Sequence, residues 1–171
     1  APAFLHIKFC ELEKEIWEDC SDYNGWISKA WLQEEWLHID ETPSQINMAR
    51  RYAFRYAVIT VLDTSRKFHV IFEDVERTAV SAVRAEDTVP LPTDDPLLKQ
   101  IDEVSVRTLA NCMQTVFEDG PKRDRRLWLG DLRLQALTNY STFQNRDLVK
   151  RCLYLFAGLQ NQDGMIPACV F

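Results

Sequence analysis

The feature that most constrains the fold is a change in the spacing of apolar residues near the middle of the chain. Between residues 50 and 83 the pattern has a period of two, with β-branched and aromatic residues dominating. The alternate positions are occupied by Tyr52, Phe54, Tyr56, Val58, Thr60 and Leu62. This period of two is typical of β-strands with one buried face. After a polar, proline-bearing segment at residues 85–94, the spacing becomes mostly three to five, which is typical of amphipathic helices. The sequence therefore predicts a sheet-forming half followed by a helical half.

The first half contains several candidate strands. Residues 4–9 fit a strand, and for residues 26–39 the composition favours a helix whereas the flanking sequence favours a strand, which we adopt. A turn at residues 63–65 precedes renewed alternation at Phe68, Val70 and Phe72. This pattern predicts a hairpin, with a further strand near residues 78–83.

The second half begins with a clear helix start. Asp95 is a suitable N-cap, and Pro96 suits the first helical position because it has no N–H group to satisfy. An apolar stripe then runs from Leu97 to Phe117, and Gly120 follows it. We therefore expect a helix that ends near Gly120.

Two more helices are expected downstream. One runs from Asp131 to about Tyr140, and the other begins after an Asn145 cap and stops near Gly164. The side chains expected to face inward are Leu132, Leu134 and Leu137 in the second helix, and Leu148, Val149, Cys152, Leu153, Phe156 and Leu159 in the third.

Composition excludes several classes of function. The chain of 171 residues is 46 % hydrophobic and can bury a core, while its net charge of −6 argues against a nucleic-acid partner. No apolar run is long enough for a membrane span, and the first residues lack the apolar core of a signal peptide. Compartment and oligomeric state stay open.

Metal and cofactor sites are not expected either. Five widely spaced cysteines include no Cys-x-x-Cys pair and no Cys/His cluster, so neither a zinc site nor any other metal site is predicted. A disulfide between Cys10 and Cys20 stays open. With five glycines and no glycine-rich loop, the chain has no scaffold for a nucleotide cofactor.

One loop concentrates charged side chains beside an aromatic one. Its sequence, from Asp119 to Asp131, reads D-G-P-K-R-D-R-R-L-W-L-G-D. Glycoside hydrolysis commonly uses one carboxylic acid to protonate the leaving oxygen and a second carboxylate to activate water or to attack carbon. Trp128 offers a face for a sugar ring, and arginine forks can orient carboxylates or bind hydroxyl groups. The plainer alternative is a salt-bridged connection between helices, in which Asp131 is an N-cap and Trp128 lies in the core.

The loop closely resembles the signature of the bacterial α-L-rhamnosidases of glycoside hydrolase family seventy-eight, D-G-x-K-R-D/E-R-x-x-W-x-G-D. Residues 95–105 resemble the first barrel helix of that family, and residues 50–56 resemble the last strands of the preceding β-sandwich. Every fixed position of the signature is filled, by Asp119, Gly120, Lys122, Arg123, Asp124, Arg125, Trp128, Gly130 and Asp131.

The resemblance implies a fold and a set of roles. The fold is α+β by segment: β-sandwich strands with a linker over residues 1–90, then the first helices of an (α/α)6 barrel over residues 91–171. By motif position Asp124 is the general acid of an inverting hydrolase acting on terminal α-L-rhamnosyl residues. Many relatives have Glu near this position, and Asp is one methylene shorter. The residues implied to bind rhamnose are Asp119, Arg123, Trp128 and Asp131.

The resemblance also implies that the site is incomplete. The general base of the family comes from a later barrel helix, so we expect this 171-residue segment alone to have little or no activity. The substrate would be a rhamnose-containing glycoside or polysaccharide, with no cofactor.

The aromatic residues of the first half support a rival interpretation. A non-catalytic carbohydrate-binding module could use them as a platform, although large aromatics more often pack in cores or between domains. These residues are Trp17, Tyr23, Trp26, Trp31 and Trp36. We favour packing, and we expect the acidic run Glu11–Glu15 to be a solvated face. A third possibility is an interaction domain in which the charged loop only connects helices.

Overall fold

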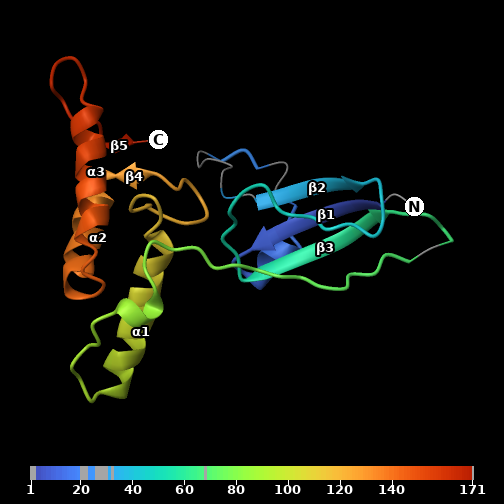
Figure 1. Cartoon of the computed structure of the whole chain (residues 1–171), viewed down its shortest axis with the longest axis horizontal. Helices are drawn as coiled ribbons and strands as arrows, with labels where there is room; N and C mark the ends of the chain where they lie inside the picture. Colours follow the sequence, from blue (N-terminus) through green and yellow to red (C-terminus); the bar gives the residue numbers. More distant parts are fainter. Residues whose placement is uncertain (1–2, 20–22, 26–30, 32, 68, 171) are drawn as a thin grey trace. The chain divides into compact units, whose positions relative to one another are not determined.

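The computed structural model describes residues 3–19, 23–25, 31, 33–67 and 69–170 (Figure 1). The chain forms two compact units. The first contains the residues up to Arg77 together with Lys122–Asp124, and the second contains Thr78–Pro121 and the residues from Arg125 onward. Antiparallel strands come first along the chain and three α-helices follow, so the predicted α+β class is confirmed.

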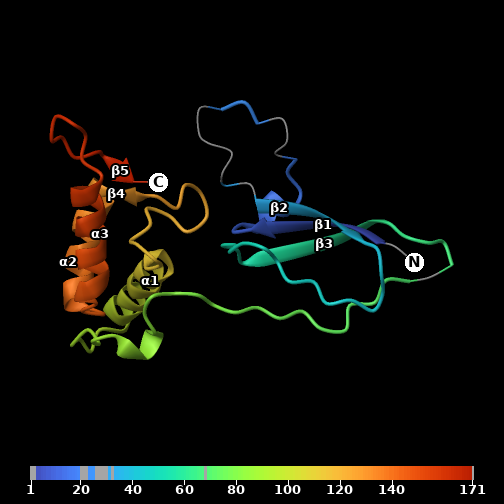
Figure 2. The same ribbon diagram turned by 45° about the horizontal axis from the view of Figure 1, so that its top comes forward.

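The first unit is built on a three-stranded antiparallel sheet in the order β2-β1-β3, visible in Figures 1 and 2. Its strands are β1 (Ala3–Cys10), β2 (Gln33–Ile39) and β3 (Tyr56–Asp63). Along β1 the buried residues Ala3, Leu5, Ile7 and Phe9 alternate with half-buried ones, as the pleat requires.

The other face of the sheet carries stacked cross-strand pairs. Phe4 stacks on His38 with ring centroids 4.2 Å apart, and His6 stacks on Trp36 at 4.7 Å. Each pair joins residues directly opposite in the β1–β2 register, where facing side chains interact most closely. These pairs therefore help to fix the register.

The strand predictions are partly right. The strand predicted at residues 4–9 is present as β1, and the strand predicted at 26–39 is present over Gln33–Ile39 as β2. Trp31 has a 3-10 conformation, and residues 26–30 and 32 lie outside the described residues. The prediction of a hairpin after the turn at 63–65 is wrong, and so is the prediction of a strand at 78–83, because residues 69–83 contain no strand. Alternation makes a chain suitable for a sheet, but a strand also needs a neighbour for its hydrogen bonds, and β3 pairs with β1 instead.

The second unit contains α1 (Pro96–Cys112), α2 (Leu129–Ser141) and α3 (Arg146–Gly158), with a short pair of strands, β4 (Leu127–Trp128) and β5 (Cys169–Val170). The short 3-10 helices are η1 (Glu13–Ile16) in the first unit and η3 (Ala85–Asp87) in the second. Side chains from all three α-helices and from the loop after α1 form the core of the second unit, which includes Leu109, Met113, Phe117, Leu127, Leu132, Leu148, Cys152 and Phe156.

Both predicted N-caps are confirmed. The Asp95 carboxylate accepts from the backbone N–H groups of Leu97 and Leu98, at 2.8 and 3.4 Å. The Asn145 side-chain oxygen accepts from the N–H of Leu148 at 3.0 Å. Each cap supplies an acceptor to N–H groups that have no partner inside the helix.

Removing the Asp95 cap is expected to destabilise the second unit. Asp95→Ala leaves the first N–H groups of α1 without their acceptor, which costs about 0.5–2 kcal/mol at typical N-caps. The helical circular dichroism signal, followed through urea unfolding, measures the change. Asp94→Ala, which removes an exposed neighbouring carboxylate, is the matched control. Equal effects of the two substitutions would contradict the capping role.

The predicted helix ends and inward faces need correction. The first helix ends at Cys112, not near Gly120, because the chain turns at Met113, where Met113 and Phe117 form an isolated β-bridge. The third helix ends at Gly158, not near Gly164. In α2 the buried residues are Leu132, Ala136 and Asn139, which share one helical face, and the leucines predicted to face inward beside Leu132 are instead exposed. The exposed residues that we expected to be inward are Leu134 and Leu137 in α2 and Leu153 and Leu159 in α3.

Candidate active-site loop

The predicted loop connects the turn after α1 to α2, and hydrogen bonds between Asp119 and Arg126 join its two ends. The Asp119 N–H donates to the carbonyl of Arg126 at 2.9 Å. In return, the Asp119 carboxylate oxygen Oδ1 accepts from the N–H groups of Arg126, at 3.0 Å, and Gly120, at 2.9 Å. Oδ1 therefore accepts both hydrogen bonds from the loop backbone, and Oδ2 accepts neither of them.

Asp124 lies at the centre of the loop and is largely buried. Its side chain is 16 % exposed, and the Arg123 Nε atom lies 3.5 Å from Oδ2. The next residue, Arg125, has a φ of 53°, in the left-handed region that non-glycine residues rarely adopt. Such a backbone conformation persists only where the surrounding structure holds it, and Gln144, outside the loop, has a similar φ of 56°. The loop therefore places one largely buried carboxylate beside an arginine side chain.

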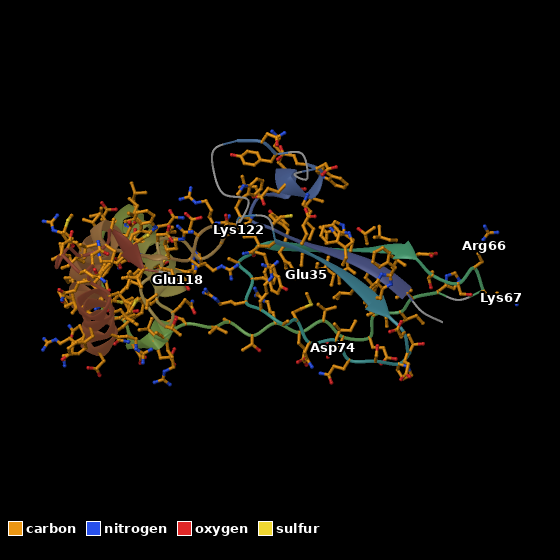
Figure 3. All side chains as sticks on the ribbon, turned by 90° about the horizontal axis from the view of Figure 1, so that it is seen from above. Glu35, Arg66, Lys67, Asp74, Glu118 and Lys122 are labelled. Atoms are coloured by element: carbon orange, nitrogen blue, oxygen red, sulfur yellow. The ribbon has the colours of Figure 1, made fainter. Side chains whose placement is uncertain are left out.

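Lys122, labelled in Figure 3, lies two residues before Asp124 and is buried. Its ammonium group forms an ion pair and hydrogen bond with Glu15 of η1. Nζ also lies 6.0 Å from the centre of the Trp31 ring, at the outer range of a cation–π contact. Burial alone would raise the pKa of Glu15, but the hydrogen bond and charge of Lys122 outweigh it, so the pKa lies below its ordinary value.

Two parts of this network were not predicted from the sequence. We expected Glu15 to lie on a solvated face. Instead, it is paired with Lys122, which lies 107 residues later in the sequence. Lys122 filled a fixed position of the signature, yet nothing near it in the sequence indicates its partner. Only the fold, which places η1 against the loop residues of the first unit, reveals the pair.

Trp128 and Asp131 lie where the loop enters α2. Trp128 pairs with Cys169 in the β4–β5 ladder and is half-buried, while its neighbour Leu127 is fully buried. Trp128 rather than Asp131 is the N-cap residue of α2, and Asp131 is exposed in the first turn. A carboxylate in this position is stabilised by the helix dipole.

The structure brings some of the predicted site residues together. Arg123 and Asp124 contact each other in the first unit, and Asp119 contacts the loop backbone in the second. Trp128 and Asp131 also belong to the second unit.

The aromatic residues of the first half have different environments. Trp17 is 83 % exposed and Trp36 is 57 % exposed, so neither packs in the core of the first unit. Trp31 is half-buried, with its ring edge-to-face with Tyr23 at 5.9 Å. Trp26 lies outside the described residues. Cys10 has a free, buried thiol, and Cys20 is also outside the described residues. No helix in the described part of the chain is both long and apolar enough to cross a membrane.

Two family models match successive parts of the chain. The model of the glycosyl hydrolase family 78 alpha-rhamnosidase N-terminal domain matches residues 1–79. The model of the bacterial alpha-L-rhamnosidase six-hairpin glycosidase domain matches residues 86–170. A comparison with curated proteins gave no match.

A solved structure of a rhamnosidase from Klebsiella oxytoca with rhamnose bound is similar to the whole chain. The two are 55 % identical, with a TM-score of 0.94. The match covers 100 % of this chain and 33 % of that one, so the chain spans about a third of the length of the solved rhamnosidase.

Proposed function

Because the chain belongs to glycosyl hydrolase family 78, we propose that the whole protein hydrolyses terminal α-L-rhamnosyl residues of glycosides or polysaccharides. The observation that carries the proposal is the loop at residues 119–131, which fills every fixed position of the rhamnosidase signature. The similar enzyme of known structure holds rhamnose, which supports a rhamnose-containing substrate.

Asp124 is proposed as the general acid. In its protonated form it would give its proton to the glycosidic oxygen as the bond to the anomeric carbon breaks. A second carboxylate would deprotonate a water molecule that attacks the opposite face of the sugar, which inverts the anomeric centre. Inverting enzymes separate the two carboxyl groups by roughly 6.5–9.5 Å, to leave room for that water. We propose that the second carboxylate comes from outside this segment, which alone would be nearly inactive.

The remaining signature residues are proposed to hold the sugar. The Oδ2 atom of Asp119 and the exposed carboxylate of Asp131 are suited to accept hydrogen bonds from rhamnose hydroxyls. The Trp128 ring offers an apolar face, and the Arg123 guanidinium would orient Asp124 or bind a hydroxyl.

The two halves of the chain are proposed as parts of two domains. Residues 1–90 would be the β-sandwich part with its linker, and residues 91–171 the first part of a six-hairpin barrel. The family models, which match residues 1–79 and 86–170, support this division.

The stereochemistry of the product tests this proposal. When the whole protein hydrolyses 4-nitrophenyl α-L-rhamnoside in an NMR tube, the first sugar signal should be that of β-L-rhamnose, before mutarotation adds the α-anomer. The matching α-D-glucoside should not be cleaved. Initial release of α-L-rhamnose would overturn the inverting mechanism, and failure to release rhamnose from any rhamnoside would overturn the substrate assignment.

A further inference from the structure

A buried lysine so close to the proposed acid requires an explanation. Lys122 is 6 % exposed and lies two residues before Asp124. Removing a lysine ammonium from water is costly unless an opposite charge compensates. The Glu15 carboxylate provides that charge, and its own side chain is only 16 % exposed. The side chain of Lys122 is therefore held in one place.

The main chain of Lys122 is held as well. Gln33, at the start of β2, is 1 % exposed and uses both ends of its amide. Its Nε2 donates to the carbonyl of Lys122 at 3.1 Å, and its Oε1 accepts from the N–H of Ala53 at 2.9 Å. A buried amide with both ends bonded in this way fixes the groups it joins, because losing either bond leaves a buried polar group unsatisfied.

Two attachments thus converge on one residue of the loop, one through its side chain and one through its carbonyl. Asp124 follows after one intervening residue, and Arg125 then takes its left-handed conformation. A backbone in that conformation persists only where its surroundings hold it. The attachments at Lys122 supply such support on the N-terminal side of Asp124.

We propose that Glu15 and Gln33 are positioning residues, which hold the backbone of Lys122–Asp124 so that the Asp124 carboxyl meets the glycosidic oxygen. This inference rests on the proposed role of Asp124 as the acid. Neither residue touches the substrate in this scheme. Aspartate reaches one methylene less far than glutamate, so a displaced backbone is harder to offset by side-chain rotation. A misplacement of about 1 Å can lower a rate by about 10²-fold.

The test uses the whole protein and two rhamnosides that differ in leaving group. A nitrophenolate leaves without much help from an acid, whereas an alkyl or sugar alcohol needs protonation. Glu15→Gln and Gln33→Ala should therefore lower kcat for an alkyl α-L-rhamnoside by about 10-fold to 100-fold, and change kcat for the nitrophenyl rhamnoside much less. The ratio of the two rates, measured on one preparation, does not depend on how much protein is folded.

Matched controls and a benchmark complete the test. Glu13→Gln, which changes an exposed glutamate of the same 3-10 helix, and Gln45→Ala, which changes an exposed glutamine, should leave the ratio unchanged. Asp124→Asn sets the ratio expected when the acid is absent. If Asp124→Asn shifts the ratio and the Glu15 and Gln33 variants do not, positioning is refuted while the acid assignment stands. If Asp124→Asn itself leaves the ratio unchanged, the proposed function fails first.

Discussion

Asp124→Asn in the whole protein is expected to lower kcat by about 10²–10⁴-fold for rhamnosides of alkyl or sugar alcohols. The asparagine amide keeps the size of the carboxyl group but has no acidic proton for the departing oxygen. The loss should be far smaller for nitrophenyl α-L-rhamnoside, whose leaving group departs as a stable anion. Steady-state rates for the two substrates, compared with those of the unaltered protein, measure the difference.

The control for this substitution is Asp94→Asn, which makes the same chemical change at an exposed carboxylate outside the signature. It should leave both rates unchanged. Retention of normal activity by the Asp124 variant would mean that another group donates the proton. An equal loss for both substrates would point to a damaged fold rather than to a missing acid.

Phe156→Ala is expected to have the largest effect on stability, about 3–5 kcal/mol in the free energy of unfolding of the second unit. The Phe156 side chain is 2 % exposed and lies in the core formed by α1, α2 and α3. Truncation removes its buried apolar surface and leaves a cavity. Far-UV circular dichroism of this 171-residue segment during urea unfolding is a suitable measurement, because every α-helix of its described residues lies in the second unit.

Tyr154→Ala is the matched control, since it removes an aromatic ring from the same helix. Tyr154 is 75 % exposed, so its loss should change stability by no more than about 0.5 kcal/mol. If the two substitutions destabilise the unit equally, the buried face assigned to α3 is wrong.

Features governed by neighbouring residues were predictable from the sequence. Asp95 and Asn145 cap helices because a short side chain with an oxygen acceptor reaches N–H groups two or three residues ahead. The strand at β1 followed from alternation alone. The family resemblance carried the identification of the loop, because chemistry by itself favoured a plain salt-bridged connection between helices over a sugar site.

Features that depend on distant residues were not predictable in this way. The alternation at residues 68–72 suggested a hairpin, yet β3 pairs with β1, which lies more than forty residues earlier. Leu134 and Leu137 are apolar, but helix geometry places them away from the face that packs in this unit. The Lys122–Glu15 pair joins residues 107 positions apart, and no spacing rule connects them.

The two-ended amide of Gln33 has a practical consequence for observing the loop. One end binds Lys122 and the other binds the N–H of Ala53. That proton exchanges with solvent only when its bond to Gln33 opens, so its exchange rate measures how firmly the amide is held. Deuterium uptake at Ala53, a position outside the loop, therefore reports how firmly the amide that also binds Lys122 is held, without substrate or turnover.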